Sequence, residues 1–154
     1  MAASPLGEME MTMQGFWKTW ILVWCWAVIL FGVVLAAGGL QSADGAVKFL
    51  YGLLGGLGPD ALQMDAPGMR FSTALMGAVT IGWGLTILVL LPAIHAAGAP
   101  AWRGLTAALG IWYVIDGVLS AATGFALNIV PNTGLVIAYL VPVMASGALR
   151  AAGR

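Results

Sequence analysis

Charged side chains are scarce in this sequence, and their scarcity excludes most classes of soluble protein. Aspartate, glutamate, lysine and arginine together make up 8% of the 154 residues, whereas hydrophobic residues make up 61%. A soluble domain carries about 25% charged residues, so the composition is typical of an integral membrane protein. The formal net charge is zero. No run of basic residues favours binding to nucleic acid or to an anionic lipid surface.

Cysteine and histidine occur once each, which restricts the chemistry that the chain can support. Cys25 stands alone, so the sequence offers no intrachain disulfide, no Cys-x-x-Cys pair and no multi-thiolate metal site. His95 is the single imidazole and cannot provide bis-histidine haem ligation, or a zinc site without other donors. We therefore expect no metal and no cofactor, and we interpret His95 as an interfacial residue.

Two long stretches contain no charged side chain at all, residues 19–43 and residues 71–102. A helix needs about 20 apolar residues to cross the hydrocarbon core, so each stretch holds one span. A cleaved signal peptide is the alternative for the first stretch. Glu8 and Glu10 in its leader, and an apolar run too long for a signal peptide, favour an uncleaved anchor instead.

A third apolar stretch, residues 104–149, is too long for one crossing and must turn back. Its turn signal is NIVPNTG, residues 128–134, in which a proline is surrounded by asparagine and glycine. The sequence therefore predicts an all-α, four-helix transmembrane bundle as a single membrane domain over residues 1–154. The four spans are expected at about 17–40, 70–94, 104–127 and 133–149.

The first loop, residues 41–69, is the longest segment between spans. Its glycine-rich sequence GAVKFLYGLLGGLGPDAL is too short to span, and it predicts an interfacial or re-entrant helix over about 46–54. Asp44, Asp60 and Asp65 are conceivable ligands of a divalent cation. Their spacing matches no EF-hand, so a solvated loop is the preferred interpretation.

The distribution of basic residues predicts the orientation of the chain in the membrane. With four spans, both termini and the second loop share one side, and that side carries four basic residues against two on the other. The positive-inside rule then places both termini in the cytoplasm of a bacterial-type inner membrane. The four are Lys18, Arg103, Arg150 and Arg154, and the two are Lys48 and Arg70.

Small residues recur at helical spacing in the second and third spans. Gly110, Gly117 and Gly124 are seven residues apart, and Gly77 and Gly82 belong to small-xxx-small repeats in the second span. Such faces allow helices to approach closely in lipid, where packing drives association. They favour either a packed bundle or an oligomer interface, without distinguishing the two.

Tryptophan also recurs on one face of the first span, at Trp17, Trp20 and Trp24. Packing and anchoring at the membrane interface explain this stripe more simply than stacking on a cofactor.

Asp116 is the single charged residue between Arg103 and Arg150. It is expected roughly 18–20 Å from either end of its span, at a cost of about 2.5–3.5 kcal/mol for a charge at a helix centre. Ser120, Thr123 and Tyr113 share its side of the helix, which predicts an intramembrane polar site turned toward protein. No basic residue is expected at this depth. The hydroxyls of Thr80 and Thr86 and the Trp83 indole are the donors expected nearby.

Three roles for Asp116 are open at this point. It can tie helices together by hydrogen bonding, bind a proton or cation during transport, or act as an acid or base in an enzyme. The third role lacks a second titratable group at the same depth. The preferred interpretation is a non-enzymatic accessory, assembly or scaffold protein of a membrane complex, with a proton- or cation-coupled transporter as the alternative. Its expected partners are the lipid bilayer and other membrane helices, in a homo-oligomer or a larger complex.

Overall fold

Four long helices account for most of the structure, a computed structural model that describes residues 5–58 and 61–150, with side chains from Gly15 onward. The long helices are α1 (Pro5–Ala37), α3 (Met69–Ala97), α4 (Ala99–Ala122) and α5 (Ile129–Ala145). Among the described residues, four helical segments are long and apolar enough to cross a membrane, the last of which begins at Ala126, just before α5. The chain is therefore an all-α, multi-pass membrane protein, and the predicted four-helix fold is confirmed.

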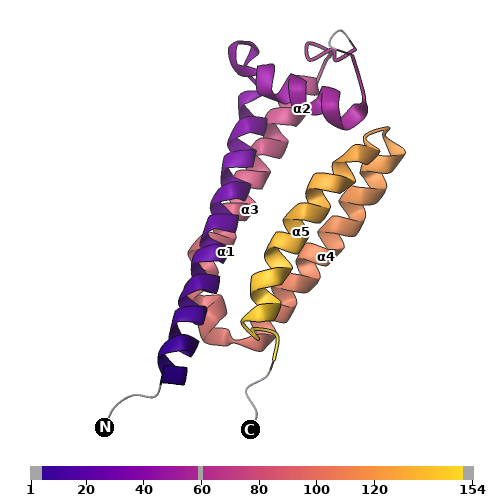
Figure 1. Ribbon diagram of the computed structural model, residues 1–154. Coiled ribbons are helices and arrows are strands. Elements are labelled where there is room, and N and C mark those ends of the chain that lie inside the picture. Colours follow the sequence, from indigo (N-terminus) through magenta and orange to yellow (C-terminus); the bar gives the residue numbers. More distant parts are fainter. Residues whose placement is uncertain (1–4, 59–60, 151–154) are drawn as a thin grey trace.

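The helices are arranged as two antiparallel pairs, α1 beside α3 and α4 beside α5 (Figure 1). α1 begins, α3 turns into α4 and α5 ends at one end of the bundle, drawn at the bottom of the view. Gly98 forms the corner between α3 and α4 with φ 69°, a backbone conformation that residues with a Cβ rarely adopt. At the other end, the short helix α2 (Gly45–Gly55) lies across the bundle (Figure 1). It is the helix predicted in the first loop.

The ends of the apolar helical segments differ from the predicted span boundaries by up to seven residues, most clearly in the second half of the chain. α4 is Ala99–Ala122 and α5 is Ile129–Ala145, where the sequence predicted 104–127 and 133–149. The turn lies before NIVPNTG, at Gly124 (φ 86°) and the short 3₁₀ helix η2 (Ala126–Asn128). The proline of NIVPNTG therefore lies in the first turn of α5. Proline is tolerated there because its missing N–H needs no partner in the first turn of a helix. The apolar segments of the first two spans are Gly15–Ala37 and Met69–Ala97, against 17–40 and 70–94.

α1 and α3 approach each other so closely that their contact depends on glycine. A Cβ built on Gly77 would lie 2.2 Å from the backbone nitrogen of Ala36, and one on Gly32 would lie 2.7 Å from that of Ile81. Both distances are shorter than van der Waals contact allows. Backbone-to-backbone packing of this kind is how small residues hold helices together in lipid.

An aromatic layer joins all four long helices in the interior. Trp24 of α1 packs against Trp83 of α3 and Tyr139 of α5, with ring centroids 5.8 and 5.4 Å apart. Trp83 continues the layer to Trp112 of α4 at 5.4 Å. Trp24 and Tyr139 are buried. This layer connects the two helix pairs through large apolar contact areas.

Two indole groups of α1 also hydrogen-bond to the backbone of α5. Trp24 donates to the carbonyl of Leu135 at 3.0 Å, and Trp20 donates to the carbonyl of Ala138 at 2.9 Å. Pro142 has no N–H with which to satisfy Ala138 four residues earlier. The Trp20 indole therefore supplies the hydrogen bond that the proline removes. Trp24 is buried in the bundle, whereas Trp20 remains exposed beside α5.

Salt bridges fix the first loop to the start of α3. Arg70 contacts Asp44 at 2.9 Å and Asp65 at 2.6 Å, and Lys48 contacts Asp44 at 3.0 Å. The hydrogen bond from Lys48, with that from Arg70, holds the pKa of the Asp44 carboxyl below its ordinary value against the opposing effect of burial. Because the charged form is the paired one, this stabilisation is present above the ordinary pKa and is lost as the pH falls through the lowered value.

The same ion pairs weaken the case for a divalent-cation site in the first loop. Asp44 and Asp65 face a guanidinium group, so their charge is already compensated by protein cations. Asp60 lies outside the described residues.

Candidate functional site

Asp116 lies on α4, close to the end of the bundle that α2 covers. It is six residues before Ala122, the last residue of the helix, which is about 9 Å along the axis. The sequence had placed it twice as far from this boundary, because the turn was expected at Asn128 and Pro131. The cost of the carboxylate is therefore smaller than the cost at a helix centre.

Three neutral groups donate hydrogen bonds to one oxygen of Asp116. The Ser120 hydroxyl lies 3.4 Å from Oδ2, and the Asn128 side-chain amide lies 3.1 Å from the same atom. The amide of Asn132 donates to Oδ2 as well. Asn128 also donates to the Ser120 hydroxyl at 3.0 Å, which closes the network. Among the residues that the structure describes, no lysine or arginine pairs with this carboxylate.

Two further polar contacts continue along the α4–α5 interface toward the other end of the bundle. The hydroxyls of Tyr113 and Thr133 are 2.7 Å apart, and those of Thr106 and Tyr139 are 3.1 Å apart. In both pairs one residue comes from α4 and the other from α5. We call the whole set the polar seam, which consists of Thr106, Tyr113, Asp116, Ser120, Asn128, Asn132, Thr133 and Tyr139.

The predicted polar site is only partly contiguous. Ser120 contacts Asp116, and Tyr113 belongs to the polar seam one turn away. Thr123 is exposed and donates to the carbonyls of Leu119 and Ser120 in its own helix. The donors expected from α3 do not reach the carboxylate: Thr80 and Thr86 bond to carbonyls of α3, and Trp83 packs in the aromatic layer.

The sequence pattern predicts a turn at the two asparagines that bind Asp116. A signal for them is nevertheless present, in the spacing of polar residues along the two helices. On α4, Thr106, Tyr113, Asp116 and Ser120 are separated by seven, three and four residues. Asn128, directly before α5, and Asn132 and Tyr139 of α5 are separated by four and seven residues. Such spacing places side chains on one continuous helix face.

The glycines predicted to pack helices fall into different environments. Gly77 contacts α1, whereas a Cβ on Gly82 or Gly110 would meet nothing within 4 Å. A Cβ on Gly117 would lie 3.9 Å from Ile129, and Gly124 makes the turn that ends α4. The open glycines therefore gain no packing contact from the described part of the chain.

Chemically, the polar seam is a set of acceptors and neutral donors around one carboxyl group. Across residues 5–58 and 61–150, no three histidine, cysteine or acidic side chains come together in a group that could hold a metal ion. Comparison with known proteins finds no family, no curated protein and no solved structure that matches this chain. The functional argument therefore depends on the geometry of the chain itself.

Proposed function

We propose that this protein is a non-enzymatic membrane protein that associates with other transmembrane helices, as an accessory, assembly or scaffold protein of a membrane complex. The observation that carries the proposal is the origin of the groups around Asp116. Ser120, Asn128 and Asn132 all belong to the same helical hairpin as the carboxylate, and all are neutral. Such a group locks α4 to α5, which is a structural task.

The outward surface of α4 supports the association with other helices. In its most apolar stretch 11% of the residues are buried within the protein, against 39% in α1. Gly110 lies on this surface with open space where its side chain would be. A glycine within a helix costs about 0.5–1 kcal/mol relative to alanine. Close approach of another membrane helix is a use for Gly110 that would offset this cost.

The association is tested by placing a leucine at an open glycine. In membranes solubilised with mild detergent, we expect the native chain to migrate in a complex larger than a single chain. Gly110→Leu should release it as a monomer that remains folded, because a side chain at this outward position clashes with nothing in the described chain. Gly134→Leu on α5 is the matched control, since that site is equally open, and it should leave the complex intact. A native chain that migrates alone would contradict the proposal.

Proton- or cation-coupled transport is the second candidate, and one detail favours it. All three hydrogen bonds reach Oδ2 of Asp116, and no described group donates to Oδ1. The residue is also only partly buried. An intramembrane carboxylate with a free oxygen is a typical binding site for a transported proton or cation.

We also propose that the protein lies in a bacterial-type inner membrane with both termini in the cytoplasm. Lys18, His95 and Arg150 gather at one end of the bundle, while Lys48 and Arg70 lie at the other, where Asp44 and Asp65 compensate them. This distribution supports the positive-inside orientation. Reporter fusions after the last residue and within residues 56–66 should give opposite sides, with the first in the cytoplasm. A periplasmic signal from the first fusion would reverse the orientation.

A further inference from the structure

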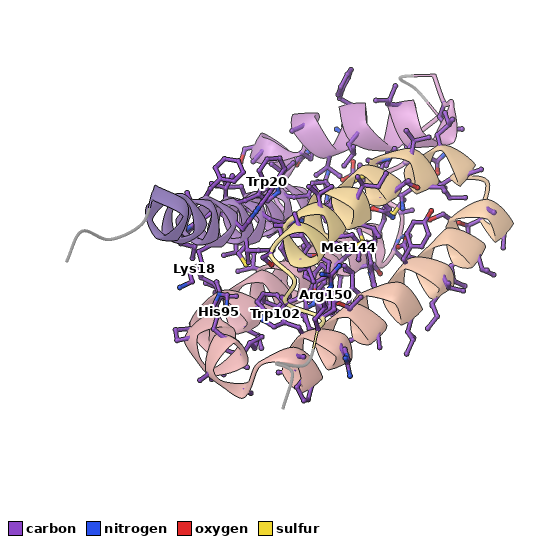
Figure 2. The ribbon with its side chains drawn as sticks, turned by 60° about the horizontal axis from the view of Figure 1, so that its bottom comes forward. Lys18, Trp20, His95, Trp102, Met144 and Arg150 are labelled. Atoms are coloured by element: carbon purple, nitrogen blue, oxygen red, sulfur yellow. The ribbon has the colours of Figure 1, made fainter. Side chains whose placement is uncertain are left out.

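A pocket opens at the end of the bundle opposite to α2, where α1, the α3–α4 corner and the end of α5 meet. Its volume is about 300 Å³, which is at the lower end of the range for ligand sites. Figure 2 views the molecule toward this end and shows Lys18, His95, Trp102 and Arg150 gathered around it. These residues come from α1, α3, α4 and the segment after α5, so no short stretch of sequence contains the site.

The ionisable side chains that line the pocket are two basic residues and one histidine. They are Lys18, His95 and Arg150, and among the side chains that the structure describes no acidic one lines the pocket. The described carboxylates are engaged elsewhere: Asp44 and Asp65 with Arg70, and Asp116 in the polar seam. The pocket therefore has the charge distribution of a site for an anion.

The segment after α5 is held in the conformation that brings Arg150 to the pocket. Gly147 has φ 71°, and the N–H of Ala148 returns to the carbonyl of Val143 at 3.1 Å, which is a regular end for a helix. Arg103 donates to the carbonyl of Leu149 at 3.0 Å, and the N–H of Arg150 bonds to Gly147 at 2.9 Å. The position of Arg150 thus follows from several hydrogen bonds.

The remaining walls of the pocket are apolar and aromatic. Ile21 and Val143 are buried side chains of α1 and α5, and Trp17 and Trp102 line the pocket beside them. The Trp102 ring packs edge-on against the His95 ring, with centroids 5.1 Å apart. Basic groups combined with tryptophans at the ends of membrane spans match an amphiphilic ligand, with an anionic head and an apolar body.

We propose that this pocket binds the phosphate group of an anionic phospholipid from the adjacent leaflet. Lys18 and Arg150 provide the positive charge for the phosphate, and the tryptophans and aliphatic walls accommodate the glycerol and the start of the acyl chains. A free phosphate ion shares the charge but makes no use of the apolar walls, which favours the lipid. In the proposed orientation the pocket faces the cytoplasmic leaflet, whose surface is negatively charged.

The test is a binding titration of the purified full chain in an uncharged detergent. Dihexanoyl phosphatidylglycerol, dihexanoyl phosphatidylcholine and inorganic phosphate are added separately, and binding is followed by tryptophan fluorescence. We expect saturable binding of phosphatidylglycerol alone. Lys18→Gln and Arg150→Gln should each weaken it about fivefold, the equivalent of about 1 kcal/mol for each basic side chain near a charged lipid. Lys48→Gln is the charge-matched control at the other end of the bundle, and it should leave the Kd unchanged.

Each other outcome overturns part of the proposal. Equal binding of phosphatidylcholine would show that charge is not recognised. Equal binding of inorganic phosphate would retain the anion site and replace the lipid by a soluble ligand. If Lys18→Gln and Arg150→Gln bind like Lys48→Gln, the lipid does not bind in this pocket.

Discussion

Gly77→Ala is expected to separate α1 from α3 and to be among the most destabilising single-methyl changes in the protein. The added Cβ would lie 2.2 Å from the backbone nitrogen of Ala36 and 2.6 Å from its Cα. Both are main-chain atoms, so no side-chain rotation can relieve the clash and the helices must move apart. We expect a loss of about 3 kcal/mol or more in the free energy of unfolding, the upper range for overpacking. Equilibrium titration with sodium dodecyl sulfate in detergent micelles measures it.

Gly82→Ala is the matched control on the same helix. A Cβ at Gly82 would meet nothing within 4 Å, so the substitution adds the same methyl group without a clash. Its effect should remain within about 1 kcal/mol of the native protein, the size of the helix-propensity difference between glycine and alanine. Equal losses for the two variants would mean that α1 and α3 do not pack through Gly77.

Asp116→Leu is expected to weaken the α4–α5 hairpin, because it removes the acceptor shared by Asn128 and Asn132. The Asn132 amide would then lose its acceptor, at a cost of about 1–3 kcal/mol for a group left unsatisfied, whereas the Asn128 amide keeps its hydrogen bond to Ser120. Asp116→Asn retains a carbonyl oxygen that accepts from both amides, so its stability should stay within about 1 kcal/mol of the native value. The same detergent titration compares the two variants.

The Asn variant also separates the structural role from transport. Asparagine cannot bind and release a proton, so a transporter would lose its activity while the fold remained intact. In the structural role, Asp116→Asn should complement a deletion strain as well as the native gene does. Thr123→Ala is the control, because the Thr123 hydroxyl bonds only within its own helix and should affect neither stability nor function. A stable Asp116→Asn protein that behaves like the deletion would refute the structural role.

The number of spans and the short helix of the first loop followed from the sequence alone. Hydrocarbon excludes charge, so the uncharged stretches 19–43 and 71–102 had to be spans, and their length decided their number. The glycine-rich segment after Asp44 was too short to cross, and the structure shows α2 there, across one end of the bundle. A membrane helix satisfies its own backbone, so these features are local and can be read along the chain.

The partners of each helix face were decided by the tertiary structure. The sequence identified Asp116 and Ser120 but not Asn128 and Asn132, because placing them depends on where α4 ends, and Gly124 ends it earlier than the proline signal suggested. The small-residue repeats likewise did not reveal which glycine contacts a backbone. Hydrophobicity does not select between neighbours in lipid, since lipid tails are as apolar as leucine. The choice depends on close fit and on hydrogen bonds, and both require the positions of two helices at once.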